Sequence, residues 1–275
     1  MKKVLLTGGA GFIGSHLLEE LIKNKYEITV IDDLSTGNLK NITSYLSRIR
    51  LYTNRIQDLQ LKDKYDIIYH LAAKANTRET GLKDFIDNVE ATEEVVKFLK
   101  TNGHIYFSSS CAVYGNQTIV TEKSPFTPIS PYGYSKWMCE LIIKNYCKNY
   151  TIFRFGNVFG ERQDGSNEMG LIGVIEYHKR NNATMEVFNN GNNERDYIYV
   201  KDVVNAMLTV HKKDIFQVGN FRTYKTIDLV KLSGVKYKIG KNNNEVKSIM
   251  LNNTKLKKLG WKPTLNVINY IQKEK

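Results

Sequence analysis

The chain has 275 residues, of which 41% are hydrophobic and 11% aromatic, a composition typical of a globular protein with a sizeable core. Its formal net charge is +12, but the lysines are spread along the chain and no known nucleic-acid-binding module occurs, so we expect no nucleic-acid partner. No apolar run approaches the ~18 residues that span a bilayer, and the first apolar run is too short for a signal peptide. We therefore expect a cytoplasmic protein with no membrane partner.

Strand and helix patterns alternate along the first half of the chain. Short apolar, β-branched runs predict strands at 3–9, 27–33, 49–58, 65–73, 104–110 and 150–160. Helical spacing of apolar residues predicts helices at 15–25 and 92–103. Strands that alternate with helices favour parallel pairing, so the predicted fold is α/β, a Rossmann-type doubly wound parallel sheet.

Thr7–Gly14 reads TGGAGFIG, between the first predicted strand and the first predicted helix. Gly8, Gly11 and Gly14 recur at intervals of three. Glycines at this spacing let the backbone approach a pyrophosphate, and the helix start attracts its negative charge. Glycines also build ordinary tight turns, but the strand–turn–helix context predicts a dinucleotide site.

The second predicted strand ends at Asp32 and Asp33. An acidic side chain here can accept hydrogen bonds from the adenosine ribose and repels a 2′-phosphate, which predicts NAD rather than NADP. We assign Asp32 to the ribose and consider Asp33 a cap or turn residue.

The alternation of strand and helix patterns becomes less regular after Gly156, where glycine and asparagine are common. A clear strand pattern followed by a helix pattern returns at 195–207. We expect an NAD-binding Rossmann domain at 1–156 and a smaller C-terminal substrate-binding lobe at 157–275. Residues 194–219 are predicted to pack back onto the first domain.

Cysteine and histidine patterns give no sign of a metal site. Cys111, Cys139 and Cys147 are scattered with no C-x-x-C pair, and the five histidines form no H-E-x-x-H pair. We therefore expect no metal.

Nine short motifs follow one another along the chain: TGGAGFIG, DDLSTGN, HLAA, NVEAT, SSSCAVYG, PYGYSK, RFGNVFGERQ, RDYIYVKDV and LGWKP. With them the chain resembles the extended short-chain dehydrogenase/reductases, in particular the NAD-dependent nucleotide-sugar epimerases of the UDP-glucose 4-epimerase type. The resemblance implies an isomerase whose cofactor-binding residues are Gly8, Gly11, Phe12, Ile13, Gly14, Asp32, Asp58, Leu59, Leu71, Ala72, Ala73, Asn88, Ser108, Tyr132 and Lys136.

The segment SPYGYSK at 130–136 supplies the implied catalytic pair, Tyr132 and Lys136. Residues four apart lie on one helical face. A free tyrosine has a pKa of about 10, so we expect the Lys136 ammonium and the oxidised nicotinamide to favour the phenolate, which can then act as a base. Lys136 could also hold the nicotinamide ribose, and we interpret Tyr134 as a packing or interface aromatic.

The segment FSSSCAVYG closes the fifth predicted strand. The resemblance implies that Ser110 is catalytic and contacts the reacting sugar oxygen, although three serines could also simply end a strand. Nucleotide-sugar dehydratases carry an Asp-Glu pair immediately after this hydroxyl residue. Cys111 and Ala112 stand there in this chain, which disfavours a dehydratase.

The implied substrate-binding residues besides Ser110 are Asn157 and Arg195. Asn157 could equally cap a turn, and Arg195 could pair with a neighbouring carboxylate. A second family arginine, expected before LGWKP in an Arg-x-Gly-Asp segment, is missing, and Lys247 or a neighbouring lysine could replace it as a point charge.

The implied reaction is transient oxidation at C4 of a nucleotide sugar, with UDP-glucose and UDP-galactose or their N-acetyl forms as the expected partners. The 4-keto sugar turns within the site and is reduced from its other face. Alternatives are a reductase, a dehydratase, a decarboxylase with Arg78 as its carboxylate ligand, or a non-catalytic NAD-binding module. The resemblance also implies a homodimer through two helices per subunit, one of which carries Tyr132 and Lys136.

Overall fold

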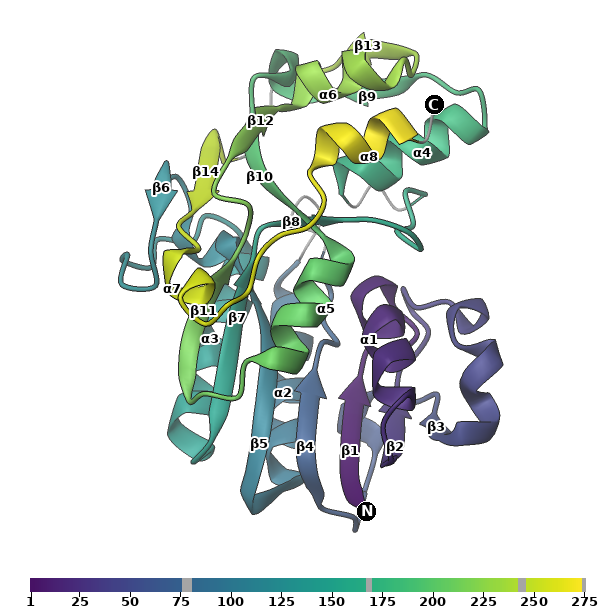
Figure 1. Ribbon diagram of the computed structural model, residues 1–275, viewed down its shortest axis with the longest axis vertical. Helices are drawn as coiled ribbons and strands as arrows, with labels where there is room; N and C mark the ends of the chain where they lie inside the picture. Colours follow the sequence, from purple (N-terminus) through teal and green to yellow (C-terminus); the bar gives the residue numbers. More distant parts are fainter. Residues whose placement is uncertain (76–80, 167–169, 242–245, 274–275) are drawn as a thin grey trace. The chain divides into compact units, whose positions relative to one another are not determined.

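The computed structural model describes residues 1–75, 81–166, 170–241 and 246–273, and Figure 1 shows its chain path. Contacts between residues divide it into two compact units. The first unit comprises Met1–Val113, Ser130–Arg154 and Met207–Ile215, and the second comprises Tyr114–Ile129, Phe155–Ala206 and Phe216–Lys275. The first unit thus lacks 114–129 and 155–156 of the predicted Rossmann domain and includes 207–215 from beyond it, while the domain boundary at 156 stays a prediction.

A seven-stranded sheet, in the order β11-β7-β5-β4-β1-β2-β3, forms the frame of the first unit. β1 (Lys2–Thr7) pairs in parallel with β2 (Tyr26–Ile31) and β4 (Tyr65–His70). β3 (Ile49–Tyr52) continues beside β2, and β5 (Leu99–Ser110) beside β4. The order completes with β7 (Tyr150–Phe155) and β11 (Asp214–Val218). This sheet confirms the predicted Rossmann-type fold, in which ligands bind beyond the strand ends where the order reverses, here at β1 and β4.

Three helices of the first unit flank this sheet: α1 (Phe12–Ile22), α2 (Leu82–Lys97) and α3 (Pro131–Tyr146). Figure 1 shows α1 in front of the sheet and α2 and α3 behind it. Val95 and Ile143 from these rear helices join Ile68, Ile105 and Ile152 from the strands in one buried apolar cluster. Burial of each such side chain contributes about 1.5–3 kcal/mol to stability.

The second unit contains two smaller sheets. One has the order β12-β10-β14-β6, with β8 also paired to β10, and the other joins β13 to β9. Its strands are β6 (Ile119–Val120), β8 (Asn157–Phe159), β9 (Met185–Val187), β10 (Glu194–Tyr199), β12 (Thr223–Lys225), β13 (Tyr237–Ile239) and β14 (Ser248–Leu251). The helices after β8 are α4 (Leu171–Arg180), α5 (Val200–Thr209), α6 (Thr226–Ser233), α7 (Thr254–Lys257) and α8 (Val267–Lys273).

Five short 3-10 helices complete the described chain: η1 (Leu39–Asn41), η2 (Thr43–Arg48), η3 (Ile56–Asp58), η4 (Cys111–Tyr114) and η5 (Phe188–Gly191).

The motifs RDYIYVKDV and LGWKP join each other within the second unit. The Trp261 indole Nε1 donates to the Asp202 carbonyl at 2.9 Å. The backbone nitrogen and hydroxyl of Thr264 donate to the Asp202 carboxylate at 2.9 and 2.7 Å. These contacts give both motifs a role in holding the C-terminal segment.

Two predicted elements differ in extent from the observed ones. The helix predicted at 92–103 is α2, which begins ten residues earlier and ends at Lys97 because Leu99 already pairs with Tyr65 in the sheet. The strand predicted at 150–160 is divided at Gly156, where a Cβ would lie 2.7 Å from the Asp196 carbonyl oxygen. Its two halves, β7 and β8, belong to different sheets.

Residues 194–219 were predicted to return to the first domain. β10 pairs with β8, β12 and β14 in the second unit, and β11 joins the seven-stranded sheet.

Across the described residues, no helix combines the length and apolar character needed to cross a bilayer. Within the same described ranges, no group of three or more His, Cys, Asp or Glu side chains could hold a metal ion.

Candidate active site

The turn after β1 requires glycine at two positions. Gly8 has a φ of +71°, and a Cβ on it would lie 2.8 Å from the Ala72 nitrogen. A Cβ on Gly14 would lie 1.9 Å from the Gly8 carbonyl oxygen. α1 begins after Gly11, and no side chain caps this helix start. A bound anion can therefore take the place of a cap, attracted by the partial positive charge of the helix start.

Asp32 follows β2 directly, and its carboxylate is buried beside this turn. Its Oδ2 accepts from the Ala10 nitrogen at 2.8 Å and its Oδ1 from the Leu34 nitrogen at 3.0 Å. Burial raises the pKa of Asp32, and these two bonds oppose the rise. Asp33 instead accepts from the nitrogen and hydroxyl of Ser35 at 3.0 and 2.6 Å, which makes it a turn residue.

The turn after β4 lies against the glycine turn. The Thr7 hydroxyl oxygen accepts from the nitrogens of Leu71 and Ala72, each at 3.2 Å. The same oxygen lies 2.8 Å from Nδ1 of His70, which is fully buried and whose pKa burial lowers to about 3. The predicted cofactor residues at the ends of β1 and β4 are thus held together by side chains of both strands.

Asn88 joins the segment after β4 to α3. Its Oδ1 accepts from the Lys74 nitrogen at 2.8 Å, and its Nδ2 donates to the Lys74 carbonyl and to the Ser135 hydroxyl, both at 3.1 Å. These protein contacts engage its amide, so its part in cofactor binding stays a prediction.

The remaining predicted cofactor residues of the first unit lie in three places. Phe12 and Ile13 open α1, and Ala73 follows the turn after β4. Asp58 ends η3 and is exposed, whereas Leu59 packs against the apolar cluster. Arg78, the candidate for a decarboxylase, lies outside the described residues.

The start of α3 places Tyr132. The Ser130 hydroxyl accepts from the Gly133 nitrogen at 3.1 Å and caps the helix, and Pro131 occupies its first turn. Tyr132 and Lys136 are therefore one helical turn apart, as predicted. The Ser110 hydroxyl, at the end of β5, is near enough to the Tyr132 phenol to lower its pKa.

Lys136 is buried behind this pair. Its Nζ donates to the Ser108 carbonyl at 2.7 Å and lies 4.8 Å from the ring centroid of Phe107 and 5.8 Å from that of Tyr132. Burial lowers the pKa of Lys136 to about 8. The ammonium is thus held by a main-chain oxygen and two ring faces.

The electrostatics of Tyr132 differ from the expectation. Burial raises the pKa of its phenol above the ordinary value, and the nearby Ser110 hydroxyl opposes this only in part. Lys136 donates to the Ser108 carbonyl and not to the phenol. The spacing was predicted correctly, whereas the lowering of the tyrosine pKa by Lys136 together with the oxidised nicotinamide stays a prediction.

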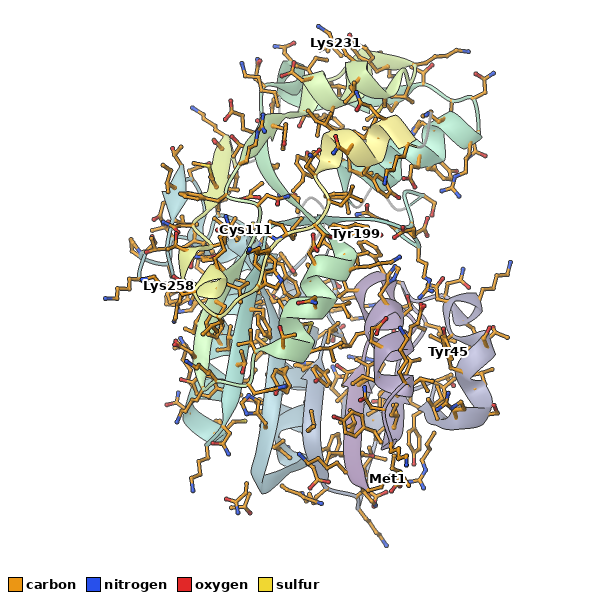
Figure 2. All side chains as sticks on the ribbon, in the orientation of Figure 1. Met1, Tyr45, Cys111, Tyr199, Lys231 and Lys258 are labelled. Atoms are coloured by element: carbon orange, nitrogen blue, oxygen red, sulfur yellow. The ribbon has the colours of Figure 1, made fainter. Side chains whose placement is uncertain are left out.

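Ser108, Ser109 and Ser110 have different partners. The Ser108 hydroxyl donates to the His70 carbonyl at 3.2 Å, and the Ser109 hydroxyl donates to Glu140 Oε1 at 2.6 Å. The Ser110 hydroxyl oxygen accepts from the Ala112 nitrogen at 3.1 Å. Cys111, labelled in Figure 2, follows at the start of η4 and is half-buried.

The predicted substrate residues Asn157 and Arg195 are both half-buried in the second unit. Asn157 opens β8 and faces Tyr197 of β10. Arg195 of β10 donates from Nη1 to the Glu194 carbonyl at 3.0 Å. The exposed Lys247 lies alongside, because its carbonyl accepts from the Glu194 nitrogen at 2.8 Å.

Asp196 has other partners. Its carboxylate is fully buried and accepts from the nitrogens of Asn220, Phe221 and Leu251 at 2.7 to 3.0 Å. Successive strand residues point to opposite faces, so Arg195 and Asp196 face away from each other.

Residues 4–220 match the family model described as the NAD dependent epimerase/dehydratase family. The chain belongs to this family. Its epimerase relatives include the UDP-glucose 4-epimerase of Lactobacillus helveticus, 30% identical over 95% of this chain and 92% of that protein.

Solved epimerase structures resemble the whole chain. The UDP-glucose 4-epimerase of Thermotoga maritima, determined with UDP-glucose, has 30% identity and a TM-score of 0.83 over 99% of both chains. The UDP-glucuronic acid 4-epimerase of Bacillus cereus, determined with UDP-glucuronic acid and NAD, has 26% identity and a TM-score of 0.86 over 98% of this chain and 96% of that one.

The residues of this epimerase-family chain fit NAD. At Gly8 and Gly14 a Cβ would collide with backbone atoms of Ala72 and Gly8, so glycine keeps the turn after β1 compact, and the uncapped start of α1 suits the charge of a pyrophosphate. The Asp32 carboxylate interacts with the backbone N–H groups of Ala10, Gly11 and Leu34, and because a carboxylate has about four acceptor positions, one remains for a ribose hydroxyl.

Sequence reasoning missed several residues that hold this epimerase site. Thr7 and His70 fasten the two cofactor turns, and Glu140 and Arg154 form a buried ion pair next to Ser109. The signal for the pair was present: Arg154 interrupts the apolar run YTIFRF, and a charge inside a buried strand requires a partner.

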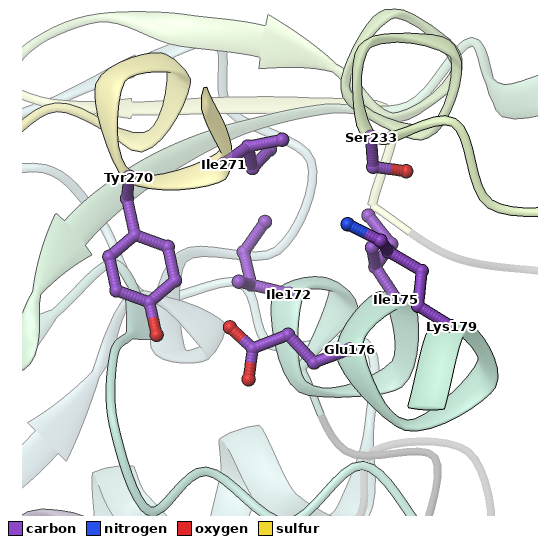
Figure 3. Close-up of a pocket in the computed structure, with 7 residues that line it drawn as sticks. All are labelled: Ile172, Ile175, Glu176, Lys179, Ser233, Tyr270 and Ile271. Carbon is purple, nitrogen blue, oxygen red and sulfur yellow. The ribbon is translucent and has the colours of Figure 1, made fainter. Parts of the chain in front are cut away.

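The hollow in Figure 3 belongs to the second unit and lies between α4, α6 and α8. Figure 3 shows the Tyr270 hydroxyl pointing toward the Glu176 carboxylate, with Ile172, Ile175 and Ile271 around them. None of the residues predicted for the epimerase site lines it, so we interpret it as a packing gap.

Proposed function

We propose that this protein is an NAD-dependent nucleotide-sugar 4-epimerase that acts by transient oxidation of the sugar at C4. The observation that carries the proposal is the grouping of Ser110, Tyr132 and Lys136 at the end of β5 and the start of α3, in a chain of the epimerase family. A hydroxyl, a phenol and an ammonium at this spacing suit proton transfer to and from a sugar hydroxyl.

Tyr132 is the proposed general base and acid. It takes the proton of the 4-hydroxyl during oxidation and returns it during reduction. Ser110 lies near the phenol and, in this proposal, hydrogen-bonds both the phenol and the sugar oxygen during the reaction, so that the proton passes along a short path. The Lys136 ammonium stabilises the phenolate form by its charge, at 5.8 Å from the ring centroid.

NAD, when bound, supplies the acceptor for the C4 hydride and its donor for the return step, and its positive nicotinamide favours the Tyr132 phenolate. We propose that Gly8, Gly11 and the start of α1 hold its pyrophosphate and that Asp32 holds its adenosine ribose. Because the hydride returns to the sugar, the cofactor is regenerated in each turnover.

For the second unit we propose that Arg195 binds the substrate diphosphate and that Asn157 binds the diphosphate or the sugar. Lys247 is the proposed second cation, because its backbone bond to Glu194 keeps it next to the Arg195 strand. A uridine nucleotide fits the UDP sugars named for the related epimerases.

A homodimer through α2 and α3 is the proposed assembly. Both helices present large apolar side chains to solvent, at exposed fractions of 36–72%: Leu82, Ile86, Tyr134, Met138 and Leu141. On α3 these side chains lie at i, i+4 and i+7, on one face. Sedimentation velocity should give the mass of two chains, and Met138→Glu should shift it to one. The cytoplasmic location and the absence of a nucleic-acid partner stay predictions.

The function is tested with purified protein and no added cofactor. UDP-galactose and UDP-N-acetylgalactosamine are incubated separately, and the anomeric proton signals are followed by NMR. We expect the gluco epimer to form from at least one of them, and Tyr132→Phe to abolish its formation. A folded protein that converts neither sugar, with or without added NAD, would contradict the proposal, and a requirement for stoichiometric NADH would indicate a reductase.

A further inference from the structure

Glu140 lies one helical turn beyond Lys136 on α3 and is fully buried. Arg154 of β7, equally buried, donates to it twice, from Nε to Oε1 at 2.8 Å and from Nη2 to Oε2 at 2.7 Å. The Ser109 hydroxyl donates to the same Oε1 at 2.6 Å. One carboxylate therefore joins α3 to the ends of β5 and β7.

A buried ion pair is a costly way to stabilise a fold. Desolvation of the two charges cancels much of their attraction, and apolar residues of similar volume often give equal or greater stability. A forked arginine–carboxylate pair does, however, fix direction and distance in a way that apolar contacts do not. The position of the Glu140–Arg154 pair in the fold therefore indicates which groups the pair orients.

The ion pair lies next to the proposed proton path. Ser109 precedes Ser110 at the end of β5, and Tyr132 shares α3 with Glu140. The Ser109–Glu140 bond therefore ties the strand end that carries Ser110 to the helix that carries Tyr132. Any shift of this strand end against α3 would have to break that bond before it changed the distance between Ser110 and Tyr132.

We propose that the Glu140–Arg154 pair is a positioning device for proton transfer: by holding Ser109 it sets the place of Ser110 relative to Tyr132. This role of the Glu140–Arg154 pair in catalysis rests on the proposed epimerase function. Glu140 also acts on Lys136 through charge, because it raises the pKa of the ammonium, which burial lowers. The pair thereby influences both partners of the tyrosine.

Ser109→Ala is the discriminating variant. It removes the bond between β5 and the ion pair, but it leaves the pair intact and touches neither Tyr132 nor Lys136. Glu140→Gln is less informative, because it leaves Arg154 as an uncompensated buried charge and can prevent folding. Thr151→Val is the control, since Thr151 is also buried and its hydroxyl donates to the Lys212 carbonyl at 2.7 Å and lies 2.8 Å from His104 Nε2, so this variant loses at least as many hydrogen bonds away from Tyr132.

Steady-state kinetics give the first readout. We expect Ser109→Ala to lower kcat about tenfold, because small misplacements of reacting groups are expensive in rate. KM should stay within about twofold, because Ser109 does not contact the substrate in this proposal. Thr151→Val should leave both constants unchanged. Equal kinetics for the two variants would overturn the positioning role.

The second readout does not depend on activity. The ¹³Cζ chemical shift of Tyr132, assigned by its loss in Tyr132→Phe, reports the surroundings of its phenol, and Ser110→Ala gives its value without the Ser110 hydroxyl. Ser109→Ala should move the shift toward the Ser110→Ala value, and Thr151→Val should not. An unmoved signal in Ser109→Ala overturns the inference even if the wild type epimerises sugars. A moved signal supports it even if the function proves to be another nucleotide-sugar reaction.

Discussion

Replacement of Asp32 by asparagine tests how the cofactor end of the site is built. Each carboxylate oxygen of Asp32 accepts one backbone N–H, from Ala10 at 2.8 Å and from Leu34 at 3.0 Å. Asparagine has a single acceptor oxygen, so one of these two N–H groups must face an amide NH₂ whichever way the side chain turns. Asp33→Asn is the matched control, because both bonds from Ser35 reach the same oxygen, Oδ1, which asparagine retains.

The expected magnitude follows from these contacts. A buried donor left without a partner costs about 1–3 kcal/mol. The substitution also removes a charge that burial disfavours, as the raised pKa of Asp32 indicates, and this offsets part of the lost stability. We therefore expect a net loss of about 1–2 kcal/mol in Asp32→Asn, which lowers Tm by about 2–8 °C in a chain of this size. Asp33→Asn should change stability by less than about 0.5 kcal/mol.

Cofactor retention gives the functional readout. Charged acceptors form the stronger hydrogen bonds, so Asp32→Asn should weaken NAD binding by about 10–100-fold. The assays are thermal unfolding and the NAD retained per chain after exhaustive dialysis, for wild type and both variants. If Asp32→Asn and Asp33→Asn had the same Tm and retained equal NAD, the assignment of Asp32 to the ribose and its place in the turn would both be wrong.

Three further predictions concern groups elsewhere in the chain. Burial lowers the pKa of His70 to about 3, so the unfolded state binds its proton first and stability is lost as pH falls below about 6.5. Urea unfolding measures how much the free energy of unfolding falls between pH 7 and pH 5, and this fall should be about 2 kcal/mol smaller in His70→Asn than in wild type. Equal falls in the two proteins would show that His70 is not held neutral in the folded state. Lys136→Met should lower kcat at least about 100-fold, and a smaller drop would argue against its charge acting on Tyr132. Asp202→Ala removes the acceptor of two Thr264 bonds and should cost about 2–3 kcal/mol in urea unfolding, whereas the exposed Asp228→Ala should not. Similar stability of these two variants would contradict a structural role for Asp202.

Local patterns predicted the parts of the molecule that depend on neighbouring residues. The glycine spacing at 8, 11 and 14 located the turn after β1, because at positions 8 and 14 only glycine fits the backbone distances. The interval between Tyr132 and Lys136 predicted their common helical face, and the Ser130–Pro131 cap fixes where that helix begins. Each feature depends on residues that lie within ten positions of one another in the sequence.

Features that depend on distant partners were not predictable in this way. The strand predicted at 150–160 divides at Gly156, where the backbone of Asp196, forty residues later, comes too close for a Cβ. The end of α2 depends on the pairing of Leu99 with Tyr65. The pKa of Tyr132 depends on how deeply α3 is covered, which spacing alone does not reveal.

Transient oxidation at C4 is tested most directly with UDP-galactose that carries deuterium at C4. The purified protein, without added cofactor, is incubated with this substrate, and the product is analysed by NMR and mass spectrometry. The account predicts that the gluco epimer keeps its deuterium at C4, because the hydride that leaves this carbon returns to its other face. Replacement of the deuterium by solvent hydrogen would show that C4 loses a proton instead, and would contradict the proposed mechanism.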